Sequence, residues 1–458
     1  MKLKVNAKLD AGFAPMSLVI REMREATKEN GQDIVIAAVR NKGYTTVYKT
    51  RVFEDNTGHD AENFKFAERI AKTLLWVAGG YKIIIAGSET IGEYIKKAFA
   101  HGGSRDFDVR FMERVYETAF EVEVVPLKNA PENISSAAPV GRHLDGCRIG
   151  FDAGGSDRKV SAVVNGESVY SEEVVWFPKT NSDPDYHYEG ILNAMKTAAS
   201  KMPRVDAIGV SSAGVYIDNR IMVASLFLKV SDEDFDKKVK NMYIDVAREI
   251  GEDIPIEVAN DGDVTALAGA MNLGDNGVLG VAMGTSEAAG YVDLDGNITG
   301  WLNELAFAPV DYNEDAMVDE WSGDYGCGVK YFSQDGVIKL APAAGIELDE
   351  ALSPAEKLKV VQGLMEKGDE RAAAIYDTIG AYFGYAIAFY SEFYDIKHVL
   401  IMGRVTSGEG GVILLSRAQE VLDTEFPELS KKIKLHIPDE KSRRVGQSVA
   451  AASLPKIN

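Results

Sequence analysis

Glycine, hydroxyl and carboxylate side chains gather at residues 152–156, directly after a short apolar run. The segment reads Asp-Ala-Gly-Gly-Ser, and the glycines Gly154 and Gly155 allow a backbone to approach a phosphate group closely. Ser156 can donate a hydroxyl hydrogen bond, and Asp152 is suited to hold Mg²⁺ through a water, because Mg²⁺ prefers oxygen ligands and retains several waters. An ordinary hairpin turn explains such a short glycine motif equally simply, so this segment alone decides nothing.

A second segment of the same kind, Met-Gly-Thr-Ser at residues 283–286, follows another predicted strand. Gly284 permits a tight turn, while Thr285 and Ser286 add hydroxyl groups to the backbone N–H groups that such a turn presents to an anion. The two loops lie about 130 residues apart in matching strand contexts. A matched pair indicates a phosphate-binding function more strongly than either loop does by itself.

The third candidate is the pair Asn260-Asp261, at the junction of an apolar strand and a helix. An aspartate at this place can accept the proton of an attacking hydroxyl, which is the role of the base in phosphoryl transfer. It can equally serve as a helix N-cap, and the two roles are compatible.

Strands and helices alternate along most of the chain, which is typical of an α/β architecture. Residues 128–145 are rich in Asn, Pro, Ser and Ala and are predicted to be a linker between domains. A hairpin–helix–strand order occurs three times, beginning near Asp33, Cys147 and Gly277. This order predicts a duplicated unit with a third, degenerate copy at the N-terminus.

The composition excludes several classes of partner. The 458 residues carry a net charge of −20, which argues against nucleic acid and anionic membranes as ligands. No apolar run approaches the ~20 residues of a membrane helix, and the N-terminus has no secretory signal. Only two cysteines are present, which fits a reducing compartment. We therefore expect a cytoplasmic protein without a disulfide framework.

The order of these motifs resembles the ROK family, which comprises bacterial sugar kinases and sugar-responsive repressors on the actin-like fold. The resemblance covers about residues 147–455. It implies an α/β, actin-like (ribonuclease H-like) fold of two lobes, preceded by an N-terminal α/β module over residues 1–140. The first lobe would span residues 141–275 and the second residues 276–458, with the C-terminal helix returning to the first lobe.

The resemblance also implies roles for individual residues. Asp261 would be the catalytic base, and ATP and Mg²⁺ would be the cofactors, with Mg²⁺ held through water by Asp152. The residues that would bind the nucleotide and its phosphates are Asp152, Gly154, Gly155, Ser156, Gly284, Thr285, Ser286, Gly403 and Arg404. The residues that would bind or enclose a sugar are Ser212, Ala213, Gly214, Asn260, Asp261 and Glu304.

The chain departs from the family pattern at several of these places. The second phosphate loop continues as Ser-Glu-Ala-Ala over residues 286–289, where the family has glycines. A Cβ there would cost roughly 1–2 kcal/mol at any position that needed a positive φ. The family's zinc loop aligns with residues 322–331, but only Cys327 of its zinc cysteines persists. Phe307 and Val329 stand where the family has a sugar-binding His and Glu. We therefore expect no structural zinc.

The sequence thus predicts ATP-dependent transfer of a phosphate to a hydroxyl of a sugar or sugar-like substrate. The alternative is a sugar or nucleotide sensor without turnover, which the altered second loop favours and the retained Asp261 and Glu304 disfavour. A DNA-binding repressor has little support, because no basic helix pair precedes the linker. The apolar replacements predict an acceptor that lacks a hydroxyl there, so plain glucose should be a poor substrate. The sequence leaves the oligomeric state open, with a homodimer as one possibility.

Overall fold

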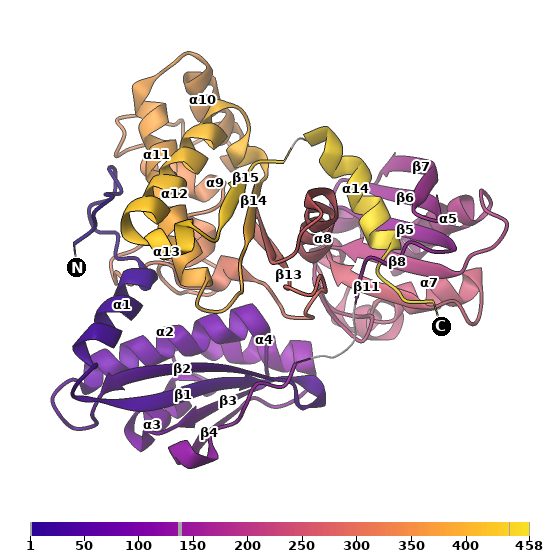
Figure 1. The fold of residues 1–458 in the computed structure, drawn as a ribbon. Helices are drawn as coiled ribbons and strands as arrows, with labels where there is room; N and C mark the ends of the chain where they lie inside the picture. The colour runs from indigo at the N-terminus through magenta and orange to yellow at the C-terminus, as the bar shows by residue number, and fades with distance from the viewer. Residues whose placement is uncertain (1, 136–139, 439, 458) are drawn as a thin grey trace. The chain divides into compact units, whose positions relative to one another are not determined.

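The structure, a computed structural model, describes residues 2–135, 140–438 and 440–457 (Figure 1). Residues 136–139 of the predicted linker lie outside this range. The chain forms two compact units. One comprises Ala137–Gly280, Gly290–Gly300 and Pro438–Asn458, and the other comprises Met1–Ser136, Val281–Ala289 and Trp301–Ile437. We call them the Asp152 unit and the Glu304 unit after a predicted site residue in each.

The Asp152 unit is built on a five-stranded sheet with the strand order β11-β8-β5-β6-β7. Its strands are β5 (Cys147–Ala153), β6 (Asp157–Val164), β7 (Glu167–Val175), β8 (Ala207–Ser212) and β11 (Ile256–Asn260). β6 pairs with β5 and β7 in antiparallel fashion, whereas β8 runs parallel to both β5 and β11. The carboxyl ends of β5, β8 and β11 therefore lie at one edge of the sheet, where α/β proteins commonly bind ligands.

The other elements of this unit are α5 (Pro184–Ala199), β9 (Val215–Ile217), β10 (Arg220–Val223), α6 (Asp232–Asp234), α7 (Met242–Ile250), α8 (Asp261–Leu273) and α14 (Glu440–Ala452). Two glycines allow α14 to lie directly on the sheet. A Cβ on Gly150 of β5 would come within 2.0 Å of the Ser448 carbonyl oxygen, and one on Gly209 of β8 within 1.7 Å of that of Ala451. No side chain fits at either position.

The Glu304 unit contains two sheets. The first has the order β2-β1-β3-β4, and its strands are β1 (Gly31–Val39), β2 (Thr45–Phe53), β3 (Lys82–Ala86) and β4 (Glu121–Val125). The helices of this part are α1 (Met16–Ala26), α2 (Asp60–Ala78), α3 (Glu89–Ala98) and α4 (Asp106–Tyr116). α2 packs on β1 and β2, while α3 packs on α2, β3 and β4.

The prediction of a degenerate actin-like copy at the N-terminus is wrong. In the Asp152 unit, three strands precede the crossover helix, and the strand after it, β8, runs parallel to β5. In the N-terminal part only two strands precede α2, so the chain re-enters the sheet from the opposite end. β3 consequently pairs with β1 in antiparallel fashion.

The second sheet has the order β13-β12-β14-β15, formed by β12 (Val278–Met283), β13 (Glu287–Val292), β14 (His398–Met402) and β15 (Lys434–His436). The chain passes between the two units within β12 and β13, of which only Val281–Met283 and Glu287–Ala289 belong to the Glu304 unit. Its helices are α9 (Gln334–Leu340), α10 (Pro354–Glu366), α11 (Glu370–Tyr390), α12 (Glu409–Glu425) and α13 (Pro427–Ser430). The first residues of the chain belong to the same core. The Lys4 amide donates to the buried Glu425 carboxylate at 2.7 Å, and the Tyr385 hydroxyl donates to the Val5 carbonyl at 3.1 Å.

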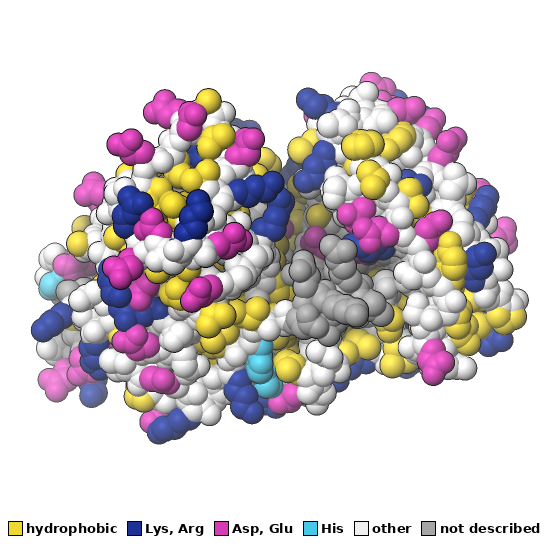
Figure 2. Space-filling model, turned by 90° about the horizontal axis from the view of Figure 1, so that it is seen from above, with side chains coloured by type: hydrophobic (Ala, Val, Ile, Leu, Met, Phe, Trp, Pro, Cys, Tyr) yellow, Lys and Arg dark blue, Asp and Glu magenta, His cyan; other side chains and the backbone are white. Residues whose placement is uncertain are grey.

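On the face shown in Figure 2, Lys and Arg side chains are interspersed with Asp and Glu side chains. None of the helices formed by the described residues is long and apolar enough to cross a membrane. The predicted mixed α/β fold is confirmed.

Candidate functional site

Three of the predicted site residues meet at the carboxyl edge of the sheet in the Asp152 unit. Asp152 is the second-to-last residue of β5 and lies opposite Ser211 of β8, while Asn260 ends β11 and lies opposite Ser212. The Ser211 hydroxyl donates to Asp152 Oδ1 at 2.8 Å, and Gln447 Nε2 of α14 lies 3.5 Å from the same oxygen. The parallel register therefore brings together residues that are up to 108 positions apart in the sequence.

The electrostatics of this edge are set by two carboxylates. Asp152 is 7% exposed, and burial raises its pKa to about 6. The hydrogen bond from Ser211 opposes this rise, while the negative charge of Asp261 adds to it. The two carboxyls are therefore electrostatically coupled, which is common for paired acids in active sites.

Asp261 is the first residue of α8, and Asn260 is its N-cap. The Asn260 side chain accepts from the Gly262 amide at 2.8 Å and donates to the Gly214 carbonyl at 2.8 Å, so it joins the helix start to the turn after β8. Gly214 has φ +139°, and a Cβ there would lie 2.4 Å from the Val223 carbonyl oxygen. Burial raises the pKa of Asp261, although the Gly262 amide and Lys179 favour its charged form.

Ser212 is completely buried, and its hydroxyl accepts a hydrogen bond from the Tyr243 hydroxyl at 3.0 Å. Its side chain thus belongs to the core beneath the edge. Of the segment predicted to enclose a sugar, only Ala213 and Gly214 are partly exposed.

The first glycine loop connects β5 to β6. Trp176 holds this loop through two hydrogen bonds. Its indole N–H donates to the Gly154 carbonyl at 2.8 Å, and its backbone amide donates to the Ser156 carbonyl at 3.1 Å. Neither Gly154 nor Gly155 has a positive φ. Gly154 is needed for space, because a Cβ there would lie 2.8 Å from the Asp157 carbonyl oxygen, whereas a Cβ on Gly155 would meet only the flexible end of the Lys179 side chain. Gly155 and Ser156 are exposed.

The sequence reasoning missed Lys179, which lies beside this loop. A Cβ on Gly155 would come within 3.0 Å of Lys179 Nζ, and the positive charge of Lys179 lowers the pKa of Asp261. This lysine stands in a short 3₁₀ turn, Pro178–Thr180, whose carbonyl at Pro178 contacts the buried ring of His187 at 3.0 Å. No sequence motif marks a lone lysine, so only the fold shows that Lys179 lies beside this loop.

In the Glu304 unit, the second glycine loop and the segment after β14 lie together. Gly403 has φ +99°, and a Cβ there would lie 2.3 Å from the Met283 carbonyl oxygen, so only glycine permits this approach. Arg404 Nη2 lies 3.4 Å from Thr285 Oγ1, and Arg404, Thr285 and Ser286 are all exposed. The loop therefore combines two hydroxyls with a cation.

The departure from glycine in this loop introduces no backbone strain. None of residues 286–289 has a positive φ, so the cost considered from the sequence does not arise. Glu287 is instead buried, at 3% exposed, and burial raises its pKa to about 8. The Tyr390 hydroxyl donates to its Oε1 at 3.4 Å, and its Oε2 has no hydrogen-bond partner among the described residues. A neutral carboxyl does not repel a phosphate.

Glu304 is partly exposed at the start of a 3₁₀ turn, Leu305–Phe307, and its amide donates to the Trp76 carbonyl at 3.0 Å. The Phe307 ring packs on the rings of Trp76 and Phe107, with distances between ring centroids of 4.3 Å and 5.5 Å. Phe307 therefore belongs to an aromatic cluster with α2 and α4, which gives this residue a packing role in addition to the one inferred from the sequence. Val329 is partly exposed in the turn Gly328–Lys330.

Cys327 is buried, with its sulfur 3.7 Å from Lys72 Nζ and 3.9 Å from Ser322 Oγ. Among the described residues, no group of three or more His, Cys, Asp or Glu side chains is arranged to hold a metal ion. The described contacts of the Cys327 sulfur are thus with Lys72, Ser322 and the carbonyls of Asp324 and Tyr325.

The structure places the predicted site residues in two groups. Asp152, Gly154, Gly155, Ser156, Ser212, Gly214, Asn260 and Asp261 belong to the Asp152 unit, and Gly284, Thr285, Ser286, Glu304, Gly403 and Arg404 belong to the Glu304 unit. In the Asp152 unit, the strand ends place Asp152 and Asn260 at the same edge of the sheet. In the Glu304 unit, they place Arg404 beside Thr285.

Comparison with solved structures identifies the fold. An ROK hexokinase from Thermus thermophilus matches with a TM-score of 0.51 at 17% identity, over 66% of this chain and 97% of its own. An ROK family transcriptional regulator, a homologue of the E. coli MLC protein, matches with a TM-score of 0.50 at 18% identity, over 68% of this chain and 79% of its own. No protein-family model and no curated protein sequence matches the chain. The chain therefore has the actin-like fold of the ROK proteins, as its motif order indicates.

Proposed function

We propose that the protein transfers the terminal phosphate of ATP to a hydroxyl group of a sugar or sugar-like molecule. The observation that carries the proposal is the convergence of Asp152, Asn260 and Asp261 at the carboxyl ends of β5 and β11, the two parallel strands on either side of β8. Phosphoryl transfer needs a carboxylate to accept the proton of the attacking hydroxyl and groups that position and neutralise the phosphates. This edge supplies the carboxylates.

Asp261 acts as the base in this proposal. Its place at the first position of α8 holds it rigidly, and burial raises its pKa towards the range in which a carboxylate accepts a proton efficiently. Asn260 fixes the orientation of the helix start through its bond to Gly214. Lys179 and the amides of the loop at residues 154–156 bind phosphate oxygens beside it.

A magnesium ion fits the donors of this edge. Asp152 is a single buried carboxylate, and Mg²⁺ in phosphoryl-transfer sites is commonly held by one or two carboxylates together with waters and substrate phosphates. The ion would neutralise negative charge on the phosphates and so assist their transfer. The hydrogen bond from Ser211 fixes Asp152 for this purpose, at 2.8 Å.

The test is an assay of ADP release from ATP and Mg²⁺ against a panel of sugars, with the wild type and Asp261→Asn. Asparagine keeps the shape and can still begin the helix, but it cannot accept a proton. We expect kcat to fall by about 10²–10⁴-fold while ATP affinity stays within about twofold. Asp253→Asn, which changes an exposed carboxylate just before β11, is the matched control and should keep full activity.

The outcomes separate the two candidate functions. ADP release that does not depend on Asp261 would contradict the mechanism. Binding of ATP and a sugar with no ADP release in the wild type would identify a sensor, and binding of neither would refute the proposal.

A further inference from the structure

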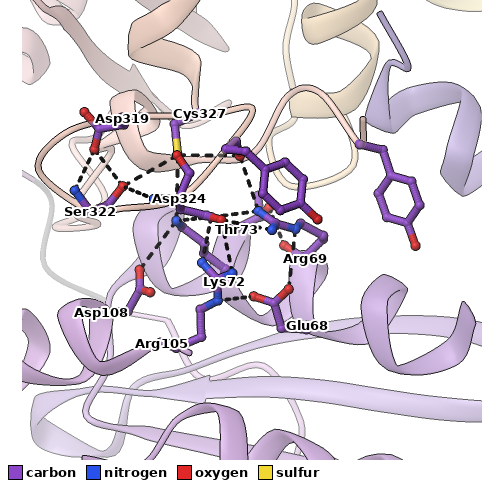
Figure 3. A network of polar contacts seen from close by, with 12 residues as sticks. Glu68, Arg69, Lys72, Thr73, Arg105, Asp108, Asp319, Ser322, Asp324 and Cys327 are labelled. Carbon is purple, nitrogen blue, oxygen red and sulfur yellow. Dashed lines mark hydrogen bonds and ion pairs between the residues drawn. The ribbon is translucent and has the colours of Figure 1, made fainter. Parts of the chain in front are cut away.

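A buried cluster of charged residues joins the N-terminal part of the chain to the loop at residues 319–327 (Figure 3). Asp324 stands at its centre. It accepts from Arg69 at 2.7 and 3.0 Å, from Lys72 at 2.5 Å and from Arg105 at 2.6 Å. Arg69 and Lys72 come from α2, and Arg105 immediately precedes α4. All these side chains are at most 9% exposed.

The cluster contains as many basic as acidic side chains, although burial raises the pKa of Glu68. Three cations, Arg69, Lys72 and Arg105, face three carboxylates, Glu68, Asp108 and Asp324. Arg105 pairs with Glu68 at 2.5 Å, and Lys72 lies 3.9 Å from Asp108. Burial disfavours ionisation of Asp324, but the three cations more than offset it and hold its pKa well below the usual range. Asp324 therefore stays ionised.

Buried ion pairs rarely stabilise a fold better than apolar side chains of similar volume, but in some proteins they specify one geometry. Here the ion cluster fixes the geometry of the loop at residues 319–327, through Asp324. The loop is closed by Asp319, whose carboxylate accepts from the Ser322 amide at 2.8 Å and whose amide donates to the Asp324 carbonyl at 2.8 Å. Beyond Cys327 the chain turns at Gly328, where a Cβ would come within 2.4 Å of Glu287 Oε2. Asp324 thus lies five residues before Val329 in the chain.

A second link runs from the same helix to Glu304. The last carbonyls of a helix have no partner within it. In α2, the carbonyls of Trp76 and Val77 accept from the amides of Glu304 and Asn303, both at 3.0 Å. The Trp76 indole donates to Asp108 at 2.6 Å, so this residue also connects the second link to the ion cluster.

We propose that α2 positions the segments around Glu304 and Val329, with Lys72 and Arg69 as positioning residues that act through Asp324. Two segments that the sequence assigns to the acceptor, around Glu304 and Val329, are held on one helix by these two links. The effect on substrate rests on the proposed function, whereas the effect on the loop does not.

The test uses the full-length protein and three variants, one of which is a control. Lys72→Met leaves a buried negative charge unpaired and is expected to fold poorly. Lys72→Met combined with Asp108→Asn removes one charge of each sign, so two cations still face two carboxylates, and the introduced amide oxygen can still accept from Trp76. Lys96→Met, on the exposed end of α3, is the control.

Hydrogen exchange of the unliganded proteins is the primary measurement. In the double variant, we expect amides of residues 319–327 to exchange at least tenfold faster, with those of β14 unchanged. Wild-type exchange at residues 319–327 would overturn the proposal, and so would an equal acceleration in β14, which would indicate general destabilisation.

Kinetics then test the effect on the substrate. We expect the KM for the acceptor to rise at least tenfold, with kcat and the KM for ATP within twofold of the wild type. An acceptor KM that stays at the wild-type value while the loop exchanges faster would overturn the positioning role. If the wild type shows no turnover, the proposed function fails, and the affinity for the sugar measured by calorimetry replaces KM.

Discussion

Substitution of Glu287 by glutamine should stabilise the protein in a way that depends on pH. Glu287 is buried in the second glycine loop, and its ordinary pKa of 4.5 is raised to about 8, chiefly by burial. The folded state therefore binds a proton more tightly than the unfolded state. The stability that this proton confers is complete below pH 4.5 and is lost as the pH rises through about 8.

The size of the effect follows from the shift. Each pH unit between the two pKa values lowers the free energy of unfolding of the wild type by about 1.4 kcal/mol. At pH 7 the loss amounts to about 3 kcal/mol. Glutamine has the same shape and cannot ionise, so the variant avoids this loss. The two proteins should be equally stable near pH 4.5 and differ by about 3 kcal/mol at pH 7.

Urea unfolding of both proteins at several pH values measures this difference, and other titrating groups cancel because they are common to both. Glu366→Gln, at the exposed end of α10, is the control and should match the wild type throughout. A difference between Glu287→Gln and the wild type that is constant from pH 4.5 to 7 would refute the assignment of Glu287 as a buried neutral acid.

Three further results are expected. Turnover should rise as the pH increases through about 6, where Asp152 ionises, and a flat profile of kcat/KM from pH 5 to 8 would contradict its role in binding the metal. Gly403→Ala should destabilise the protein by at least about 1–2 kcal/mol, because φ is +99° and the new Cβ would lie 2.3 Å from the Met283 carbonyl oxygen; an unchanged melting temperature would count against this geometry. Metal analysis after washing with a chelator should find no stoichiometric zinc, and a firmly bound ion would show that the loop around Cys327 is held differently.

The part of the site that could be predicted from the sequence consists of strand ends. Asp152, Asn260 and Met283 each follow a short apolar run, so local pattern alone located them. The parallel register then follows from the α/β alternation, and with it the proximity of Asp152 and Asn260. The order of these motifs also predicted the actin-like fold, and the solved structures confirm this prediction.

Features that depend on distant partners could not be predicted. Residues 232–250 have the pattern of one helix, yet the structure divides them into α6, a π-helical turn at Phe235–Val239 and α7. At the break, the Lys240 carbonyl forms a hydrogen bond outside the helix, because it accepts from the Ile221 amide of β10 at 2.9 Å. Similarly, Arg69 and Lys72 interrupt the apolar face of α2, and nothing near them in the sequence marks them as buried. Their partner Asp324 lies 255 positions from Arg69.

That separation has a consequence for synthesis. At about 5–20 residues per second, roughly 10–50 s pass between the emergence of Arg69 from the ribosome and that of Asp324. During this interval α2 carries two cations on the face that will later be buried. The N-terminal part therefore cannot complete its core while it is the only part made, and Glu425, the partner of Lys4, arrives later still. We expect this protein to remain incompletely folded, and able to bind chaperones, until the chain is nearly complete. In this it would differ from proteins whose domains fold one after another during synthesis.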